Sequence, residues 1–146
     1  MSKALLQAGV ALRRGEVPIG AVVVDAKGKI IARGYNRIEQ DQCQAAHAEA
    51  QAIKKACKKS GDWRLNGCWI YVTLEPCLMC MGLIQLSRIE GVVFGAESPL
   101  FGCGLGDKQK LPSYAKNLKI EGGVSAQESV VLLQAFFKGL RKKGKG

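Results

Sequence analysis

The stretch that decides the fold is CWIYVTLEPCLMC, residues 68–80. Its apolar first half predicts a strand over Cys68–Thr73. Pro76 cannot donate a hydrogen bond to a sheet but is tolerated where a helix begins, so we expect the chain to leave the strand here and to form a helix over Cys77–Leu86. A strand that passes directly into a helix indicates an α/β sheet.

On both sides of this stretch, strands and helices are predicted to alternate. Helices are predicted over Ser2–Arg14, from about Ala46 to Ser60 and over Ala126–Lys143, strands over Ile19–Val24, Lys29–Tyr35, Glu90–Ala96 and Leu118–Glu121, and loops over Asn36–Gln44 and Ser98–Pro112. The first two strands flank the turn-like residues 25–28, DAKG, and are expected to form a hairpin. This order predicts an α/β fold with a five-stranded mixed sheet, partly parallel and covered on both faces.

Length and composition fit one compact domain. The chain has 146 residues, of which 47% are hydrophobic, which is enough for a core over residues 1–146. Its apolar runs are far too short to span a bilayer. The N-terminal residues 1–14 lack the cleavage pattern of a signal peptide, so we expect a cytoplasmic protein.

The charge balance favours a polyanionic partner. The chain carries 22 Lys and Arg against 12 Asp and Glu, a net charge of +10, and ends in a basic tail over Arg141–Gly146. Nucleic acid is the first candidate for such a basic protein, and the alternative is that the charge serves solubility alone. Aromatic residues make up only 6%, so no stacking platform for single strands stands out.

Two short motifs, HAE at residues 47–49 and PCLMC at 76–80, indicate a metal site. Cys77 and Cys80 lie three apart at a predicted helix start, so their sulfurs share one face of the helix. The helix N-terminus also favours the thiolate form, which is the form that binds metal. His47, the only histidine, begins another predicted helix. A His-Cys-Cys set suits tetrahedral zinc with the fourth position open, as in catalytic rather than structural sites.

Each motif alone has a simpler interpretation. A lone histidine is commonly packed or solvated, and an isolated C-x-x-C pair is commonly structural or redox-active. The two motifs together, at this spacing, favour zinc. The remaining cysteines, Cys43, Cys57, Cys68 and Cys103, are scattered along the chain, and we interpret them as small apolar residues rather than ligands.

Glu49 is the predicted proton carrier. It lies two residues beyond His47, so in a regular helix the two side chains point in different directions and need not bind the same ion. Zinc with two thiolates and a neutral imidazole carries no net charge and is expected to be a weaker Lewis acid than zinc held by three histidines. A carboxylate that takes a proton from water and delivers it to the substrate would compensate. The simpler alternative is a first-turn glutamate that the helix dipole stabilises.

The two motifs together, H-x-E and P-C-x-x-C, resemble those of the zinc nucleobase deaminases. More narrowly, the chain resembles the bacterial tRNA-specific adenosine deaminases, which convert the wobble adenosine of an anticodon to inosine. The similar stretches are EVPIGA at 16–21, GYN at 34–36, AHAE at 46–49, YVTLEPC at 71–77, SRI at 87–89, VFGA at 93–96 and FF at 136–137. They extend over nearly the whole chain.

The resemblance implies a three-layer α/β/α cytidine-deaminase-like fold, a homodimer and a zinc ion (Zn2+) in each chain. It implies His47, Cys77 and Cys80 as metal ligands, Glu49 as the catalytic residue, and Val17, Ile19, Asn36, Ala48, Phe136 and Arg141 as substrate-binding residues. Asn36 would hydrogen-bond the base or its sugar, while Val17 and Ile19 would flank the ring. Phe136 and Arg141 would lie near bound RNA. The alternatives are a loop-capping role for Asn36 and a core position for Phe136.

The sequence leaves several functions open. Relatives usually carry an aspartate two residues after the FGA of residues 94–96, where this chain has Ser98, and the following residues 99–104 also differ. This change favours another deaminase of the same fold, acting on free guanine, cytosine or a nucleoside. The basic balance favours the anticodon loop of tRNA. A third alternative is a catalytically silent, zinc-containing RNA-binding subunit, against which the presence of Glu49 argues.

Overall fold

The computed structural model describes residues 1–105 and 117–144 of the chain. The helices are α1 (Ser2–Arg13), α2 (Ile38–Asp41), α3 (Ala48–Ser60), α4 (Leu78–Leu86) and α5 (Ala126–Lys143), and the strands are β1 (Gly20–Val24), β2 (Ile30–Tyr35), β3 (Trp69–Leu74), β4 (Gly91–Ala96) and β5 (Lys119–Glu121). Every predicted strand and helix is present, and each boundary differs from the prediction by at most about two residues. Residues 106–112 of the predicted Ser98–Pro112 loop and residues 145–146 of the basic tail lie outside the described residues.

The five strands form one mixed sheet in the order β2-β1-β3-β4-β5. β1 pairs antiparallel with both β2 and β3, whereas β3, β4 and β5 run parallel. The registers align Gly20 with Tyr35 and Leu74 with Ala96, so β1 begins at the same edge of the sheet at which β2, β3 and β4 end. The predicted five-stranded mixed sheet is confirmed, and segments far apart in sequence meet at this edge.

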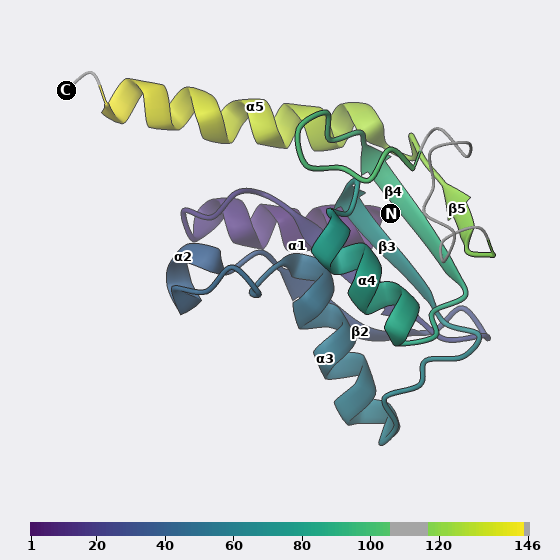
Figure 1. Cartoon of the computed structure of the whole chain (residues 1–146). Coiled ribbons are helices and arrows are strands. Elements are labelled where there is room, and N and C mark those ends of the chain that lie inside the picture. Colours follow the sequence, from purple (N-terminus) through teal and green to yellow (C-terminus); the bar gives the residue numbers. More distant parts are fainter. Residues whose placement is uncertain (106–116, 145–146) are drawn as a thin grey trace.

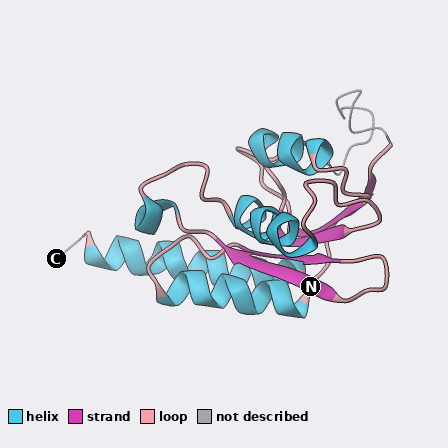
Figure 2. Ribbon diagram, turned by 90° about the horizontal axis from the view of Figure 1, so that it is seen from below, coloured by secondary structure: helices cyan, strands magenta, loops and turns pink. Residues whose placement is uncertain are grey.

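Helices cover both faces of the sheet in three layers (Figures 1 and 2). α1 and α5 pack on one face, against β1 and β4 respectively and against each other. α3 packs on the opposite face against β1 and β2, beside α4. The three-layer α/β/α architecture is therefore confirmed. It places the N-termini of α3 and α4 side by side.

Two glycines let helices approach the sheet closely. A side chain at Gly20 would collide with the backbone of α1 at Ala8 N, and one at Gly34 would lie 2.6 Å from the α3 backbone at Ala52 N. The helices present alanines here, and Ala4, Ala8, Ala48 and Ala52 are fully buried. These backbone contacts fix the depth of α3 on the sheet and hence the position of its first turn.

α2 lies within the stretch Asn36–Gln44 that was predicted as a polar loop, and the prediction of loop alone was wrong there. Its first turn is held by Glu16, whose side chain is 1% exposed. Glu16 Oε2 accepts a hydrogen bond from Glu39 N at 3.1 Å, and Oε1 accepts one from Gln40 N at 2.7 Å. A residue more than twenty positions away supplies these acceptors, so local periodicity did not reveal the helix.

None of the helices in residues 1–105 and 117–144 is long and apolar enough to cross a membrane.

Candidate active site

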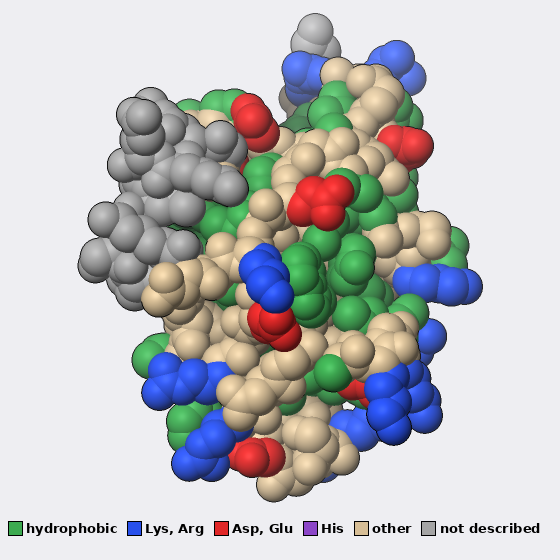
Figure 3. Space-filling model, turned by 90° about the vertical axis from the view of Figure 1, so that its right-hand side faces the viewer, with side chains coloured by type: hydrophobic (Ala, Val, Ile, Leu, Met, Phe, Trp, Pro, Cys, Tyr) green, Lys and Arg blue, Asp and Glu red, His purple; other side chains and the backbone are tan. Residues whose placement is uncertain are grey.

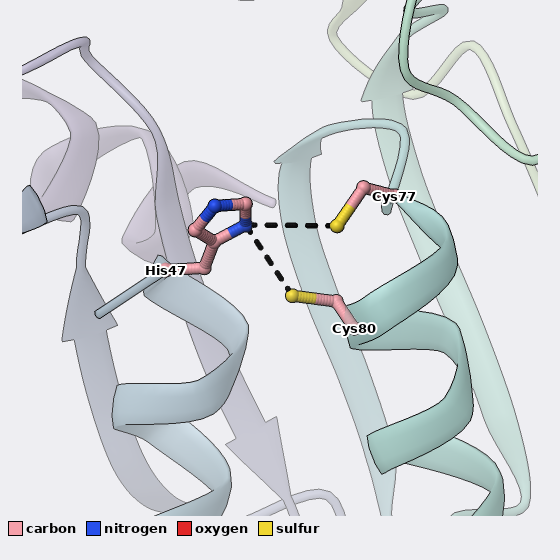
Figure 4. A group of neighbouring side chains, drawn as sticks. All are labelled: His47, Cys77 and Cys80. Atoms are coloured by element: carbon pink, nitrogen blue, oxygen red, sulfur yellow. Dashed lines mark hydrogen bonds between the residues drawn. The ribbon is translucent and has the colours of Figure 1, made fainter. Parts of the chain in front are cut away.

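The predicted metal ligands meet where α3 and α4 begin. His47 is the N-cap of α3 and Cys77 the N-cap of α4, while Cys80 lies in the first turn of α4. Figure 4 shows the His47 ring between the two helix starts, facing both sulfurs. His47 Nδ1 lies 3.7 Å from Cys77 Sγ and 3.5 Å from Cys80 Sγ. The structure therefore brings together three side chains from two segments thirty residues apart.

These distances fit a zinc ion. Zinc binds imidazole nitrogen at about 2.0–2.1 Å and thiolate at about 2.3 Å, and tetrahedral angles then separate nitrogen and sulfur by about 3.6 Å. The donor atoms of His47, Cys77 and Cys80 lie within 4.8 Å of one another, and this is the one such group of three or more His, Cys, Asp or Glu side chains among the described residues. A three-ligand set leaves the fourth tetrahedral position to water or substrate.

The electrostatics of the three groups favour a cation at their centre. Hydrogen bonding from Cys80, and then from His47, lowers the pKa of Cys77 to about 4. The Cys80 pKa is raised, first by its hydrogen bond to Cys77 and then by burial. Cys77 likewise raises the pKa of His47 through a hydrogen bond. The pKa of Cys77 thus lies in the range that favours its thiolate, and a bound divalent cation would stabilise the thiolate form of Cys80 as well.

Glu49 lies in the first turn of α3, two residues beyond His47, and is 4% exposed. Burial raises the pKa of its carboxyl group. His47, Glu49 and Cys77 line the same cavity, so the carboxyl group and the metal-ligand set open onto one space. A carboxyl group with a raised pKa is suited to accept and return a proton near neutral pH.

The cavity has a volume of about 680 Å³ and lies at the edge of the sheet identified above. Four predicted substrate-binding residues line it: Val17, Ile19, Asn36 and Ala48. Its volume falls within the range of about 300–1,000 Å³ for sites that bind small molecules.

Asn36 lines this cavity and has a buried polar atom without a partner among the described residues. The residue is 2% exposed, and its Nδ2 donates a hydrogen bond to Val17 O at 3.4 Å. No partner for Asn36 Oδ1 is found in the described part of the chain. A buried acceptor without a partner costs free energy, and a ligand that donates a hydrogen bond would recover it.

The other two predicted substrate-binding residues do not line the cavity. Leu133 and Phe137 of α5 do, whereas Phe136 contacts Phe137 edge-on with a ring-centroid distance of 5.3 Å. Arg141 lies on the exposed last turn of α5. The roles of Phe136 and Arg141 remain predictions. The sequence motif FF at 136–137 located the aromatic pair, but only the helix orientation decides which ring faces the cavity.

The sequence marked Ser98 and residues 99–104 as a departure from relatives that bears on substrate choice, but it did not place them or Glu75 at the wall of the cavity. Residues 97–101, which follow β4, line it, and so does Glu75, which directly follows β3. The signal available was the strand order: the ends of adjacent parallel strands share an edge, and ligands bind at that edge in α/β sheets. The sequence alone did not show that β3 and β4 are adjacent.

Comparison with known proteins agrees with this geometry. Residues 1–96 match the cytidine and deoxycytidylate deaminase zinc-binding region. The chain therefore belongs to the cytidine and deoxycytidylate deaminase family and is a zinc-dependent hydrolytic deaminase.

Similar proteins include deaminases of two substrate classes. A tRNA-specific adenosine deaminase of Bacillus subtilis (strain 168) is 47% identical over 147 aligned residues, which cover 99% of this chain and 91% of that protein. A structure from biochemical and structural studies of A-to-I editing by tRNA:A34 deaminases at the wobble position of transfer RNA has a TM-score of 0.83 at 38% identity, covering 91% of this chain and 97% of that one. A guanine deaminase from Bacillus subtilis has a TM-score of 0.64 at 32% identity, covering 94% of this chain and 90% of that one.

We predict that Cys80→Ala abolishes zinc binding. The variant leaves two protein ligands and removes one of the two thiolates, whereas the wild type is expected to hold about one zinc ion per chain. Elemental analysis of the purified proteins measures this directly. The matched control is Cys43→Ala, which removes an exposed cysteine that does not belong to the donor group and should retain its zinc. Full zinc occupancy in Cys80→Ala would rule out the ligand assignment.

We predict that Glu49→Gln retains zinc but lowers kcat by about 10²–10⁴-fold, the usual contribution of a general acid–base group. The amide preserves the shape of the side chain and cannot carry the proton. Rate measurements on zinc-quantified samples test this, with Glu90→Gln as the control because Glu90 is a surface residue paired with Lys119. Loss of zinc together with activity would instead make Glu49 a support of the metal site.

Proposed function

We propose that the protein converts the wobble adenosine of a tRNA anticodon loop to inosine by hydrolytic deamination. The observation that carries this proposal is the 47% identity, over nearly the full length of both chains, to a tRNA-specific adenosine deaminase. We further propose that residues 1–146 form a single deaminase domain, and that it works in the cytoplasm, where an anticodon is used.

The proposed chemistry assigns one role to each buried group. His47, Cys77 and Cys80 hold zinc, which, when bound, supplies a Lewis acid that activates water. Glu49 would take one proton from water and return it to the purine ring nitrogen as the hydroxyl adds to the ring carbon that bears the amine. It would then carry the proton of that hydroxyl to the amine, which leaves as ammonia when its C–N bond breaks. The buried position of Glu49 beside His47 keeps the carboxyl group within the cavity where both transfers occur.

The cavity walls suit a flipped-out base. Val17 and Ile19 present apolar surface, against which a planar ring can pack. Asn36 Oδ1 offers a buried acceptor for a donor of the base or sugar. Enzymes that modify a base extrude it from the stack and recognise it by such stacking and hydrogen bonding.

α5 links the cavity to the basic surface. Leu133 and Phe137 line the cavity, and Arg141 follows Phe137 by four residues, so it lies one turn further along the same face of the helix. Lys142 and Lys143 complete an exposed basic last turn. Lys and Arg side chains also gather on the lower half of the face shown in Figure 3, in keeping with the net charge of +10. An RNA backbone passing the cavity mouth would meet the cations of α5.

A free-base deaminase is the first alternative, and the comparisons do not favour it. The likeness to guanine deaminase covers most of both chains, although its TM-score of 0.64 is below the 0.83 of the tRNA-deaminase structure. A catalytically silent RNA-binding subunit has less support, because Glu49 is present and faces the cavity.

The deciding experiment is a substrate panel. The zinc-loaded protein is incubated with an anticodon stem-loop carrying adenosine at the wobble position, with the same stem-loop carrying guanosine there, and with free adenine, adenosine, guanine and cytosine. Ammonia release and product mass are recorded. We expect turnover of the adenosine stem-loop and inosine as its product. Turnover of guanine or cytosine alone would establish the free-base alternative.

We predict that Arg141→Gln weakens binding of the stem-loop and flattens its salt dependence. Each phosphate contact contributes about 0.7–0.9 to the slope of log affinity against log salt, so losing one contact should reduce the slope by about that amount. Binding titrations over a range of salt concentrations measure it. Lys27→Gln is the matched control, since Lys27 is exposed in the turn between β1 and β2. Equal slopes in all three proteins would remove Arg141 from the RNA interface.

We also propose that the protein is a homodimer in which α4 packs against a second copy. This helix is apolar around most of its circumference, and a helix of that kind is normally buried on all sides. On its outer side, however, Leu78 is 64% and Leu86 69% exposed in the single chain. A second copy presents an equally apolar helix, so an isologous contact would remove both surfaces from water.

We predict that light scattering gives twice the mass of one chain for the wild type, and that Leu86→Lys shifts the mass toward the monomer. A charge at this position has no partner in an apolar interface and would be expensive to desolvate. Leu6→Lys provides the control, because Leu6 is 60% exposed on α1, in the opposite layer. A monomeric wild type at micromolar concentration would contradict the proposal.

A further inference from the structure

Glu75 is a buried carboxylate that the proposed chemistry does not use. It follows β3, directly before Pro76 and Cys77, and is 6% exposed. Taking a carboxylate out of water is costly unless hydrogen bonds replace its hydration. The hydrogen-bond partners of Glu75 therefore indicate its structural role.

Those partners are the two ends of one segment. Glu75 Oε2 accepts a hydrogen bond from Ser98 N at 3.0 Å, and Oε1 accepts one from Leu105 N at 2.6 Å. A single side chain thus holds both ends of residues 98–105. Bonds between an ionised acceptor and a backbone N–H are stronger than neutral ones.

The segment is fitted closely to this carboxylate. Gly102 N donates to Ser98 O at 2.9 Å, and Cys103 N donates to Pro76 O at 3.3 Å, which folds the middle of the segment back toward β3. A Cβ atom at Gly102 would collide with Glu75 Oε2. The glycine is therefore required by the close approach of the backbone to the side chain of Glu75.

The segment forms a wall of the cavity whose side chains have little packing of their own. Ser98, Pro99, Leu100 and Phe101 line the cavity. Leu100 is 86% exposed and Phe101 75% exposed, so the hydrophobic core does not fix their positions. Their placement depends on the backbone beneath them, and that backbone is tied to Glu75.

We propose that Glu75 is a positioning residue that preforms the Leu100–Phe101 wall, against which the substrate packs. It acts on substrate affinity, and the metal ligands and Glu49 carry out the chemistry without it. Because the wall is already ordered before the substrate binds, binding does not have to overcome the entropy cost of ordering the segment. The proposal rests on the proposed function in taking the anticodon stem-loop as the substrate to be measured.

The test compares Glu75→Gln with the wild type in steady-state kinetics on the adenosine stem-loop. The amide keeps one acceptor but turns an NH2 group toward the other backbone N–H, so one end of the segment is released. We expect KM to rise about tenfold, since a hydrogen bond to a charged group contributes at least about that factor. Zinc content and kcat should change little. Glu90→Gln, the same substitution on the surface, is the control.

A double-mutant cycle separates positioning from general structural support. Leu100→Ser with Phe101→Ser removes the apolar wall itself and, at these exposed positions, leaves folding intact. If Glu75 acts through the wall, Glu75→Gln raises KM much less in this background than in the wild type. An equal rise in both backgrounds, an unchanged KM, or loss of zinc from Glu75→Gln would each overturn the proposal.

Gly102→Ala provides a second route should Glu75→Gln fail to fold. This variant keeps the carboxylate of Glu75, but its added methyl group would push the segment away from that carboxylate. We expect the same rise in KM, and the same double-mutant cycle with the Leu100 and Phe101 substitutions tests it. The activity of the wild type on the stem-loop distinguishes failure of the proposed function from failure of the proposed role of Glu75. If the wild type does not deaminate the stem-loop, the proposed function is wrong. If it does, and KM is insensitive to both variants, only the role of Glu75 is wrong.

Discussion

The approach of His47 Nδ1 to two sulfurs, at 3.7 and 3.5 Å, is the constraint on which the rest of the structure depends. Three donor atoms on two helices can surround one ion only if both helices start at the same point. The sheet brings the two helix starts together. Cys77 follows the end of β3, and the close contact of α3 with Gly34 fixes the distance of His47 from the sheet. The packing of both helices on one sheet therefore satisfies the constraint that the three donor atoms impose.

The same edge of the sheet gathers the groups that would recognise a substrate. β1 begins there and β2, β3 and β4 end there, so residues from four connections face one cavity. Two buried glutamates organise its rim. Glu16 accepts two backbone N–H groups of α2, and Glu75 accepts two from the segment after β4. The hydrogen bonds offset the free-energy cost of burying each carboxylate. They also order backbone segments that the hydrophobic core does not hold in place.

The proposed deamination chemistry and the proposed substrate contacts thus occupy different parts of the molecule. The predicted ligands and Glu49 lie at the starts of α3 and α4, and both helices contribute buried side chains to the hydrophobic core. The rim is formed by α2, by residues 97–101 and by α5, whose side chains are more exposed. Such an arrangement permits relatives with one metal site to act on different bases, because connections change more easily than packed elements.

The sequence by itself determined every strand, every helix except α2, and the class of deaminase. These signals depend on neighbours along the chain, so they can be interpreted without a structure: the strand and helix periods, Pro76, and the H-x-E and P-C-x-x-C motifs. Only the tertiary structure decided that α2 forms, that Phe137 rather than Phe136 lines the cavity, and that Glu75 holds a wall. Each of these depends on helix orientation or on contacts between residues twenty or more positions apart, which local patterns do not encode.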